Sequence, residues 1–441
     1  MAFGYRLDAT DREIGRIAIP AMGALAADPL LSLVDTALVG ALGRIPLAAL
    51  GINLAVFTTL FVVFNFLTYG TTAEVARHRG ADDEVGAVTY ALQALWMALA
   101  LGVVLLVLLQ ATAPLIAQAM GATGEVRDPT LVYLRIRALA AIPFLIIMVG
   151  HGVFRGLKDT TTPLKIALWA NGVNIALSYV LIHPVGMGIA GAAWGTVIAQ
   201  LGAAAVFLRQ GSQALGSPVF RFDPTAMRRM IRVSRDLFLR TLSLLSATLI
   251  TTAIAARMGI TVVAGHQVVR EVWTLLALTL DGFAIAGQAM VGTALGARRA
   301  DLAYQQTKRL LGWGVATGIV LAPIVLLLGG IAPRLFTRDM GVLVEIDQVW
   351  WFMAALLPIG GLVFIADGIL MGMGDLRFLL WSTALASLGA LVPIGLAALW
   401  LDGGIVGLWI GMAGLMLVRG VTCAWRLSPP GWERALAQNA L

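Results

Sequence analysis

The chain has 441 residues, of which 59% are hydrophobic and 12% are charged, and its formal net charge is +7. Soluble domains carry about 25% charged residues, so this sequence has roughly half the charge that a water-exposed surface needs. The composition therefore excludes a cytoplasmic enzyme, a disordered chain and a free nucleic-acid-binding protein. The single cysteine, Cys423, also excludes a disulfide framework and a multi-thiol metal site.

Apolar stretches long enough to cross a bilayer, which takes about 20 residues per helix, follow one another along the whole chain. In the first half they are residues 14–42, 46–76, 85–110, 131–156, 163–182 and 188–208. In the second half they are residues 237–258, 262–295, 307–330, 349–372, 376–399 and 404–425. The sequence therefore predicts an all-α polytopic membrane protein with twelve transmembrane helices.

Basic residues are concentrated in the segments between these apolar stretches. Most of the 31 Lys and Arg residues fall on one side of the membrane if both termini are cytoplasmic, as the positive-inside rule requires. We therefore expect a multi-pass protein of a bacterial plasma membrane. The arginine-rich segment 224–235 is predicted to form a basic amphipathic helix on the membrane surface.

The two halves of the sequence repeat each other at an offset of 216 residues. Segment 152–159 (GVFRGLKD) matches 368–375 (GILMGMGD), and segment 188–195 (GIAGAAWG) matches 404–411 (GIVGLWIG). We predict two six-helix lobes, 1–208 and 237–441, joined by a cytoplasmic linker, 209–236. Because six is an even number, the lobes are parallel repeats with a cavity between them, an arrangement typical of transporters.

The clearest acid inside a predicted helix is Asp35. A charge at the bilayer centre costs at least ~2.5–3.5 kcal/mol, so such acids are functional candidates. Because burial disfavours the charged form of a carboxylic acid, Asp35 is a candidate for binding and releasing a proton; the alternative is a structural acid. Asp28 lies on the same helical face and is a candidate for lining the cavity, with a structural role as its alternative.

Polar side chains are distributed unequally between the two repeats. The first half has oxygen-bearing residues where the second half is nearly apolar: Asp35, Asn174, Ser178 and Thr196. Asn174 and Ser178 are one helical turn apart and share a face. Such ligands suit a proton or Na⁺ rather than a transition metal, so these four residues are the candidate cation-coupling site. The alternative is hydrogen bonding between helices.

The second half has acids at other positions. Asp281 aligns with Asn65 in the repeat, and Asp367 aligns with His151. All four are candidates for the substrate cavity or a gate. For Asp281 the alternative is a buried polar contact, and Asp367 is predicted to pair with Arg377.

Several segments resemble the MATE (multidrug and toxic compound extrusion) family in its DinF-like branch: 29–40 (PLLSLVDTALVG), 47–51 (LAALG), 70–73 (GTTA), 152–160 (GVFRGLKDT), 264–267 (AGHQ) and 280–284 (LDGFA). The resemblance implies a V-shaped antiporter that exports drugs or other organic molecules in exchange for H⁺ or Na⁺. The family's first-helix aspartate falls on Asp35, its asparagine on Asn174 and its sixth-helix threonine on Thr196. Members with a fuller cation site have a second aspartate where this chain has Ser178. This chain therefore has a single carboxylate at the site, which favours H⁺ over Na⁺.

We therefore expect a cation-coupled antiporter that exports organic cations, drugs or other xenobiotics by alternating access. An exporter or flippase of a metabolite or lipid-linked substrate is the alternative. A membrane-embedded enzyme is less favoured, because neither a P-loop nor a His-Glu-x-x-His motif occurs. The expected partners are a small organic substrate and the lipid bilayer, without nucleic acid, cofactor or bound metal, and we expect a monomer.

Overall fold

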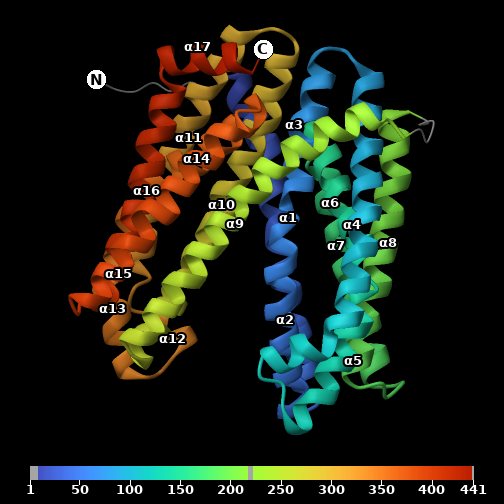
Figure 1. The fold of residues 1–441 in the computed structure, drawn as a ribbon, viewed down its shortest axis with the longest axis vertical. Helices are drawn as coiled ribbons and strands as arrows, with labels where there is room; N and C mark the ends of the chain where they lie inside the picture. The colour runs from blue at the N-terminus through green and yellow to red at the C-terminus, as the bar shows by residue number, and fades with distance from the viewer. Residues whose placement is uncertain (1–7, 217–221, 440–441) are drawn as a thin grey trace. The chain divides into compact units, whose positions relative to one another are not determined.

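The computed structural model describes residues 8–216 and 222–439, apart from the side chain of Asp28, and this part of the chain is almost entirely helical (Figure 1). The helices of the first half are α1 (Ala9–Gly40), α2 (Arg44–Val63), α3 (Asn65–Gly80), α4 (Glu84–Ala119), α5 (Arg127–Ala138), α6 (Ala141–Gly156), α7 (Thr161–Ile182) and α8 (Ile189–Leu215). Those of the second half are α9 (Pro224–Met258), α10 (Ile260–Gly296), α11 (Ala300–Leu327), α12 (Ala332–Phe336), α13 (Met340–Met373), α14 (Leu376–Ala386), α15 (Val392–Trp400), α16 (Gly404–Leu427) and α17 (Pro429–Gln438).

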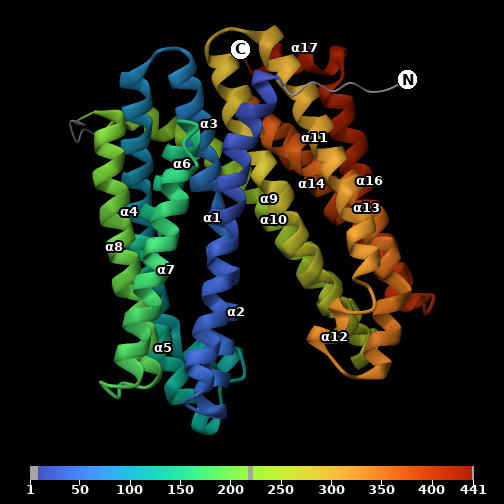
Figure 2. The same cartoon turned by 180° about the vertical axis from the view of Figure 1, so that it is seen from behind.

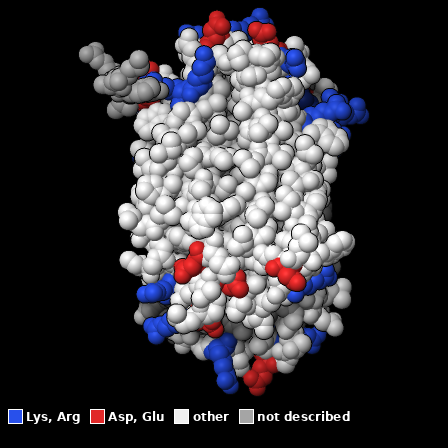
Figure 3. Space-filling model, turned by 90° about the vertical axis from the view of Figure 1, so that its left-hand side faces the viewer, with Lys and Arg blue, Asp and Glu red and all other residues white. Residues whose placement is uncertain are grey.

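The predicted all-α membrane fold is confirmed. Within the described residues, 11 helices are long and apolar enough to cross a membrane, and a pair bent by 50° between Ala138 and Ala141 would raise the number to 12. On the face drawn in Figure 3, charged side chains gather toward the two ends and uncharged residues cover the middle. This distribution is the one that a bilayer requires, because charges are costly at its centre.

One predicted element is different in the structure. Segment 224–235 does not form a separate surface helix, because it is the beginning of α9, which continues without a break to Met258. No glycine follows Pro224 within α9, and no second proline occurs there. The chain therefore has no residue that would end the helix between its basic and apolar parts.

The described chain divides into two compact units. Unit 1 comprises Met1–Ala18 and Arg235–Leu441, and unit 2 comprises Ile19–Ser234. Helices α1 and α9 each contribute residues to both units. The predicted division into 1–208, a linker 209–236 and 237–441 differs from these units at two places. Residues 209–234 of the linker belong to unit 2, and the first 18 residues belong to unit 1, where the start of α1 is bonded to α11 as described below.

The sequence repeat is visible in the packing of each unit. In unit 2, a Cβ atom on Gly152 of α6 would lie 2.8 Å from the backbone oxygen of Thr68 on α3. In unit 1, a Cβ atom on Gly368 of α13 would lie 2.1 Å from the backbone oxygen of Ala284 on α10. Both pairs are 216 positions apart, so the same close helix contact, which only glycine permits, is used twice.

Helices α7 and α8 carry the polar residues singled out in the first repeat, and they run side by side in unit 2 (Figure 2). Helix α5 packs against α8, α4 and α2. A hydrophobic cluster joins these helices to the end of α1: Val39, Ala49, Leu50, Phe57, Tyr133, Leu134, Ala138, Ile189, Ala192 and Ala193. These contacts position the candidate site.

Candidate functional site

Three of the four predicted cation-site residues form one buried hydrogen-bond network between α7 and α8. The Nδ2 atom of Asn174 donates to Oγ1 of Thr196 at 3.0 Å, and Oγ of Ser178 donates to Oδ1 of Asn174 at 3.4 Å. Oγ1 of Thr196 donates to the backbone oxygen of Ala192 at 3.0 Å. The network is closed off from solvent, because Asn174 is 1% exposed and Ser178 is fully buried.

Small residues on α8 allow this network to form. A Cβ atom on Gly195 would lie 2.4 Å from Oγ of Ser178, and one on Gly191 would lie 2.7 Å from the backbone carbon of Leu181. The two glycines are one turn apart on the face of α8 that touches α7. Backbones can approach closely where glycines recur at this spacing in membrane helices.

Asp35 lies near the end of α1 and is only 7% exposed. Its Oδ1 atom is buried and has no hydrogen-bond partner in the described structure. Val39, one turn further along α1, belongs to the hydrophobic cluster that contains Tyr133 and Phe57. A buried carboxylate with an unsatisfied oxygen is costly unless it takes up a proton or a cation, so Asp35 is chemically suited to the role predicted for it.

Tyr133 of α5 lies near both Asp35 and the hydrogen-bond network. It is 3% exposed and lies close enough to Thr196, Asp35 and Arg137 to interact with each of them. Asp35 and Thr196 therefore lie near the same tyrosine. Whether the four residues bind a coupling cation stays a prediction.

Arg137, a basic residue that acts on Asp35, was not recognised as a site residue in the sequence. Arg137 falls within the predicted helix 131–156, where the sequence analysis gave it no role, and the structure buries it on α5, where it interacts electrostatically with Asp35. The predicted helix is bent, and its first arm, α5, packs into unit 2. The spacing of Tyr133 and Arg137, one turn apart on a face with Leu134 and Ala138, was the available signal.

The remaining candidates in the first half lie elsewhere in unit 2. Asn65 is half-buried at the first residue of α3, and Nδ1 of His151 on α6 is buried without a hydrogen-bond partner in the described structure. The His151 ring lies 5.0 Å from that of Phe207. Neither residue hydrogen-bonds to Asn174 within the described part of unit 2. The side chain of Asp28 lies outside the described residues.

In unit 1, Asp281 is half-buried on α10 and takes part in polar interactions. Asp367 is 5% exposed on α13, and its Oδ2 atom accepts hydrogen bonds from the guanidinium groups of both Arg240 and Arg419. The predicted pairing of Asp367 with Arg377 was therefore wrong. Arg377 is exposed in the first turn of α14, whereas α9 and α16 bring the two buried arginines to Asp367.

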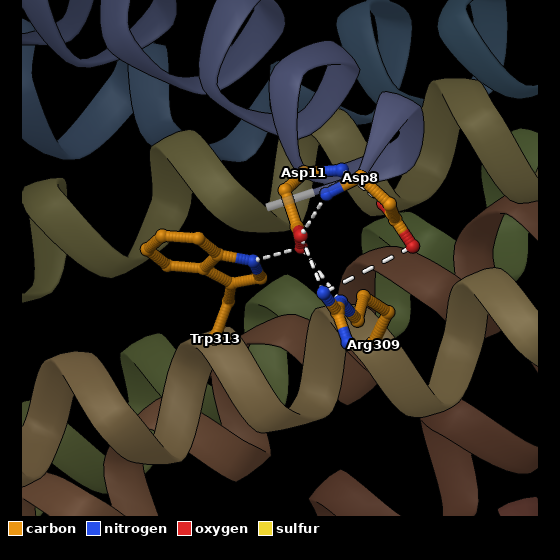
Figure 4. Close-up of polar contacts among 4 residues, drawn as sticks. All are labelled: Asp8, Asp11, Arg309 and Trp313. Carbon is orange, nitrogen blue, oxygen red and sulfur yellow. Dashed lines mark hydrogen bonds and ion pairs between the residues drawn. The ribbon is translucent and has the colours of Figure 1, made fainter. Parts of the chain in front are cut away.

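A second polar cluster fixes the beginning of α1 to α11 within unit 1 (Figure 4). The Asp11 side chain is 2% exposed. Its Oδ1 atom accepts hydrogen bonds from Nε of Arg309 at 2.7 Å and from Nε1 of Trp313 at 2.8 Å. Its Oδ2 atom accepts one from the backbone N–H of Asp8 at 2.9 Å. These bonds explain why the start of α1 belongs to the unit formed by the second half of the chain.

The chain matches known membrane transporters over nearly its full length. The MatE family matches residues 20–180 and 237–396. Protein DETOXIFICATION 44, chloroplastic, from Arabidopsis thaliana is 33% identical over 429 residues, which cover 94% of this chain and 82% of that protein. DNA damage-inducible protein F from Escherichia coli (strain K12) is 28% identical over 441 residues, which cover 97% of this chain and 94% of that protein.

The fold also matches solved structures. A crystal structure of MATE in the bent conformation aligns with a TM-score of 0.89 at 22% sequence identity, covering 98% of both chains. Together, the family match and the identity to the Arabidopsis relative decide the assignment. The chain belongs to the MatE family and is a multi-pass multidrug and toxic compound efflux transporter.

Proposed function

We propose that this transporter exports organic cations, drugs or other xenobiotics in exchange for protons, with Asp35 as the proton-binding group. The observation that carries the proposal is the carboxylate of Asp35, buried in unit 2 with one unpartnered oxygen. The name of the Arabidopsis relative, DETOXIFICATION 44, supports a toxic compound as the cargo.

The donor set around Asp35 supports a proton rather than Na⁺. A metal cation replaces its hydration shell with several oxygen ligands, whereas a proton needs a single basic oxygen. In the neighbouring network, Oδ1 of Asn174 and Oγ1 of Thr196 are already engaged in hydrogen bonds, and Ser178 contributes no charge. Protonation removes the buried charge of Asp35 without further ligands.

Transport follows from this site by alternating access. Proton and substrate can change the balance between outward-open and inward-open states only through a difference in their affinity for the two states. We infer that protonated Asp35 favours the state that releases substrate outward. The basic loop residues support cytoplasmic termini in a bacterial plasma membrane.

Dye counterflow in proteoliposomes tests this function. Uptake of the fluorescent cation ethidium is measured under a pH gradient and, separately, under a Na⁺ gradient. We expect flux driven by the pH gradient in the wild type and its loss in Asp35→Asn. Asp128→Asn, which changes an exposed carboxylate on α5, is the matched control and should transport normally. Asp35→Asn transport at the wild-type rate, with the same pH dependence, contradicts the proposal.

One observation favours a second candidate, the export of an anionic metabolite or lipid-linked molecule. Unit 1 buries two arginines, Arg240 and Arg419, on the single carboxylate of Asp367, which leaves an excess of positive charge. Absence of dye flux under either gradient, together with flux of an organic anion, supports this candidate instead.

A further inference from the structure

Arg137 is fixed in a buried position by side chains from two neighbouring helices. One guanidinium nitrogen donates a hydrogen bond to Oε1 of Gln200 on α8 at 3.0 Å. Its guanidinium carbon lies 5.2 Å from the ring centroid of Phe57 and 5.3 Å from that of Phe61, both on α2. Cation–π contacts of this kind stabilise a charged guanidinium where water is scarce. Arg137 thus provides a fixed positive charge inside unit 2.

That charge acts on the carboxylate of Asp35. Asp35 and Arg137 interact electrostatically, and Tyr133, one turn before Arg137 on α5, interacts with both. The packing agrees with this interaction, because one hydrophobic cluster contains Val39, one turn after Asp35, together with Tyr133 and Ala138, which flank Arg137 on α5.

Among the described residues, Arg137 is the charged group that acts on Asp35, and the acid of α5, Asp128, lies at the beginning of that helix. The charged residues of the surrounding helices lie toward their ends: Arg44 at the start of α2, Lys165 in the first turn of α7 and Arg209 in the last turns of α8. On α1 itself the preceding acid is Asp28, whose side chain is not among the described residues. The described groups that act on Asp35 are therefore one cation and one tyrosine.

We propose that Arg137 is a selectivity residue of the cation site, whose fixed positive charge excludes Na⁺ from Asp35 and leaves the proton as the coupling ion. The inference rests on the proposed proton coupling at Asp35. A unit charge close to a carboxylate weakens cation binding to it by ~10- to 1000-fold. A buried carboxylic acid still binds a proton after such a loss, because burial disfavours its ionised form. A Na⁺ site lacks this compensation, since it depends on attraction to the ionised oxygens.

The experiment compares Arg137→Gln with Arg137→Lys in the same proteoliposome assay. Glutamine removes the charge and can still donate to Gln200, whereas lysine keeps the charge. Arg135→Gln is the matched control, because Arg135 is exposed on the same helix. Dye flux is measured against pH and against a Na⁺ gradient, and ²²Na⁺ binding to the purified protein is measured directly.

For Arg137→Gln we expect a pH midpoint about one unit higher, a tenfold effect on proton affinity, and the appearance of Na⁺-driven flux with ²²Na⁺ binding. Arg137→Lys should keep the wild-type pH midpoint and show no Na⁺-driven flux, and Arg135→Gln should behave as the wild type. A folded Arg137→Gln protein with the wild-type pH midpoint and no Na⁺ response overturns the inference. Proton coupling itself remains supported in that case, provided that Asp35→Asn is inactive.

A second variant tests the same inference if Arg137→Gln does not fold. Ser178→Asp leaves Arg137 in place and adds a negative charge one turn from Asn174, so it should also gain a Na⁺ response. Absence of that response in folded Ser178→Asp argues against charge balance as the basis of selectivity. Na⁺-driven flux in the wild type overturns both the selectivity role and the proposed proton coupling.

Discussion

Replacing Asp367 with asparagine should destabilise unit 1 more than replacing either arginine that binds it. The Oδ2 atom of Asp367 accepts hydrogen bonds from both Arg240 and Arg419, and all three residues are at most 8% exposed. In Asp367→Asn, two buried guanidinium groups lose their shared counter-charge and face each other. In Arg419→Gln, by contrast, one carboxylate and one guanidinium remain as a balanced pair.

The magnitudes follow from these contacts. Removing one partner from a buried ion pair costs about 3–5 kcal/mol, because the other charge is left uncompensated. Asp367→Asn uncovers two such charges, so we expect it to reach the upper part of this range. Arg419→Gln loses one charge-assisted hydrogen bond but also removes the excess positive charge, so we expect a loss of about 1–2 kcal/mol.

Equilibrium unfolding in mixed micelles, followed by tryptophan fluorescence, measures the free energy of unfolding of each variant. Asp402→Asn, at an exposed carboxylate after α15, serves as the control and should match the wild type. The expected order of stability is wild type, then Arg419→Gln, then Asp367→Asn. If Asp367→Asn is as stable as Arg419→Gln, the argument from buried charge balance is wrong.

Two further predictions concern the packing of the candidate site and the cap of α4. Gly195→Ala should weaken both transport and thermal stability, because its Cβ atom would lie 2.4 Å from Oγ of Ser178; a proteoliposome flux equal to the wild type contradicts this. Asp83 caps α4 by accepting a hydrogen bond from the backbone N–H of Gly86 at 2.8 Å, and its other carboxylate oxygen bonds to the ring of His78 at 2.8 Å. Both bonds lower the pKa of Asp83 from its usual value. A lowered pKa in the folded state stabilises the protein above the unfolded pKa, and this contribution is lost as pH falls through the folded value. Asp83→Ala should therefore lower the free energy of unfolding by about 0.5–1 kcal/mol at neutral pH, and its difference from the wild type should decrease at acidic pH. A difference in the free energy of unfolding that does not depend on pH argues against the cap.

The candidate site was predictable in part. Asp35, Asn174, Ser178 and Thr196 were recognised because polar residues inside apolar helices are rare, and because the second repeat lacks them. The hydrogen bonds among Asn174, Ser178 and Thr196 follow from the spacing of α7 residues and from Gly195 on α8. The role of Arg137 was missed because an arginine near the end of a predicted transmembrane helix is expected to face the membrane surface. The bend between α5 and α6 instead places it in a buried position.

The sequence by itself determined the helices, their approximate ends and the twofold repeat. A long apolar segment in a bilayer must satisfy its own backbone hydrogen bonds, so its length and composition are sufficient to predict a helix. Only the tertiary structure decided which buried charges meet: Asp367 with Arg240 and Arg419, Asp11 with Arg309, and Asp35 near Arg137. These partners lie far apart in the chain, and their approach depends on helix packing and bends that no local pattern records.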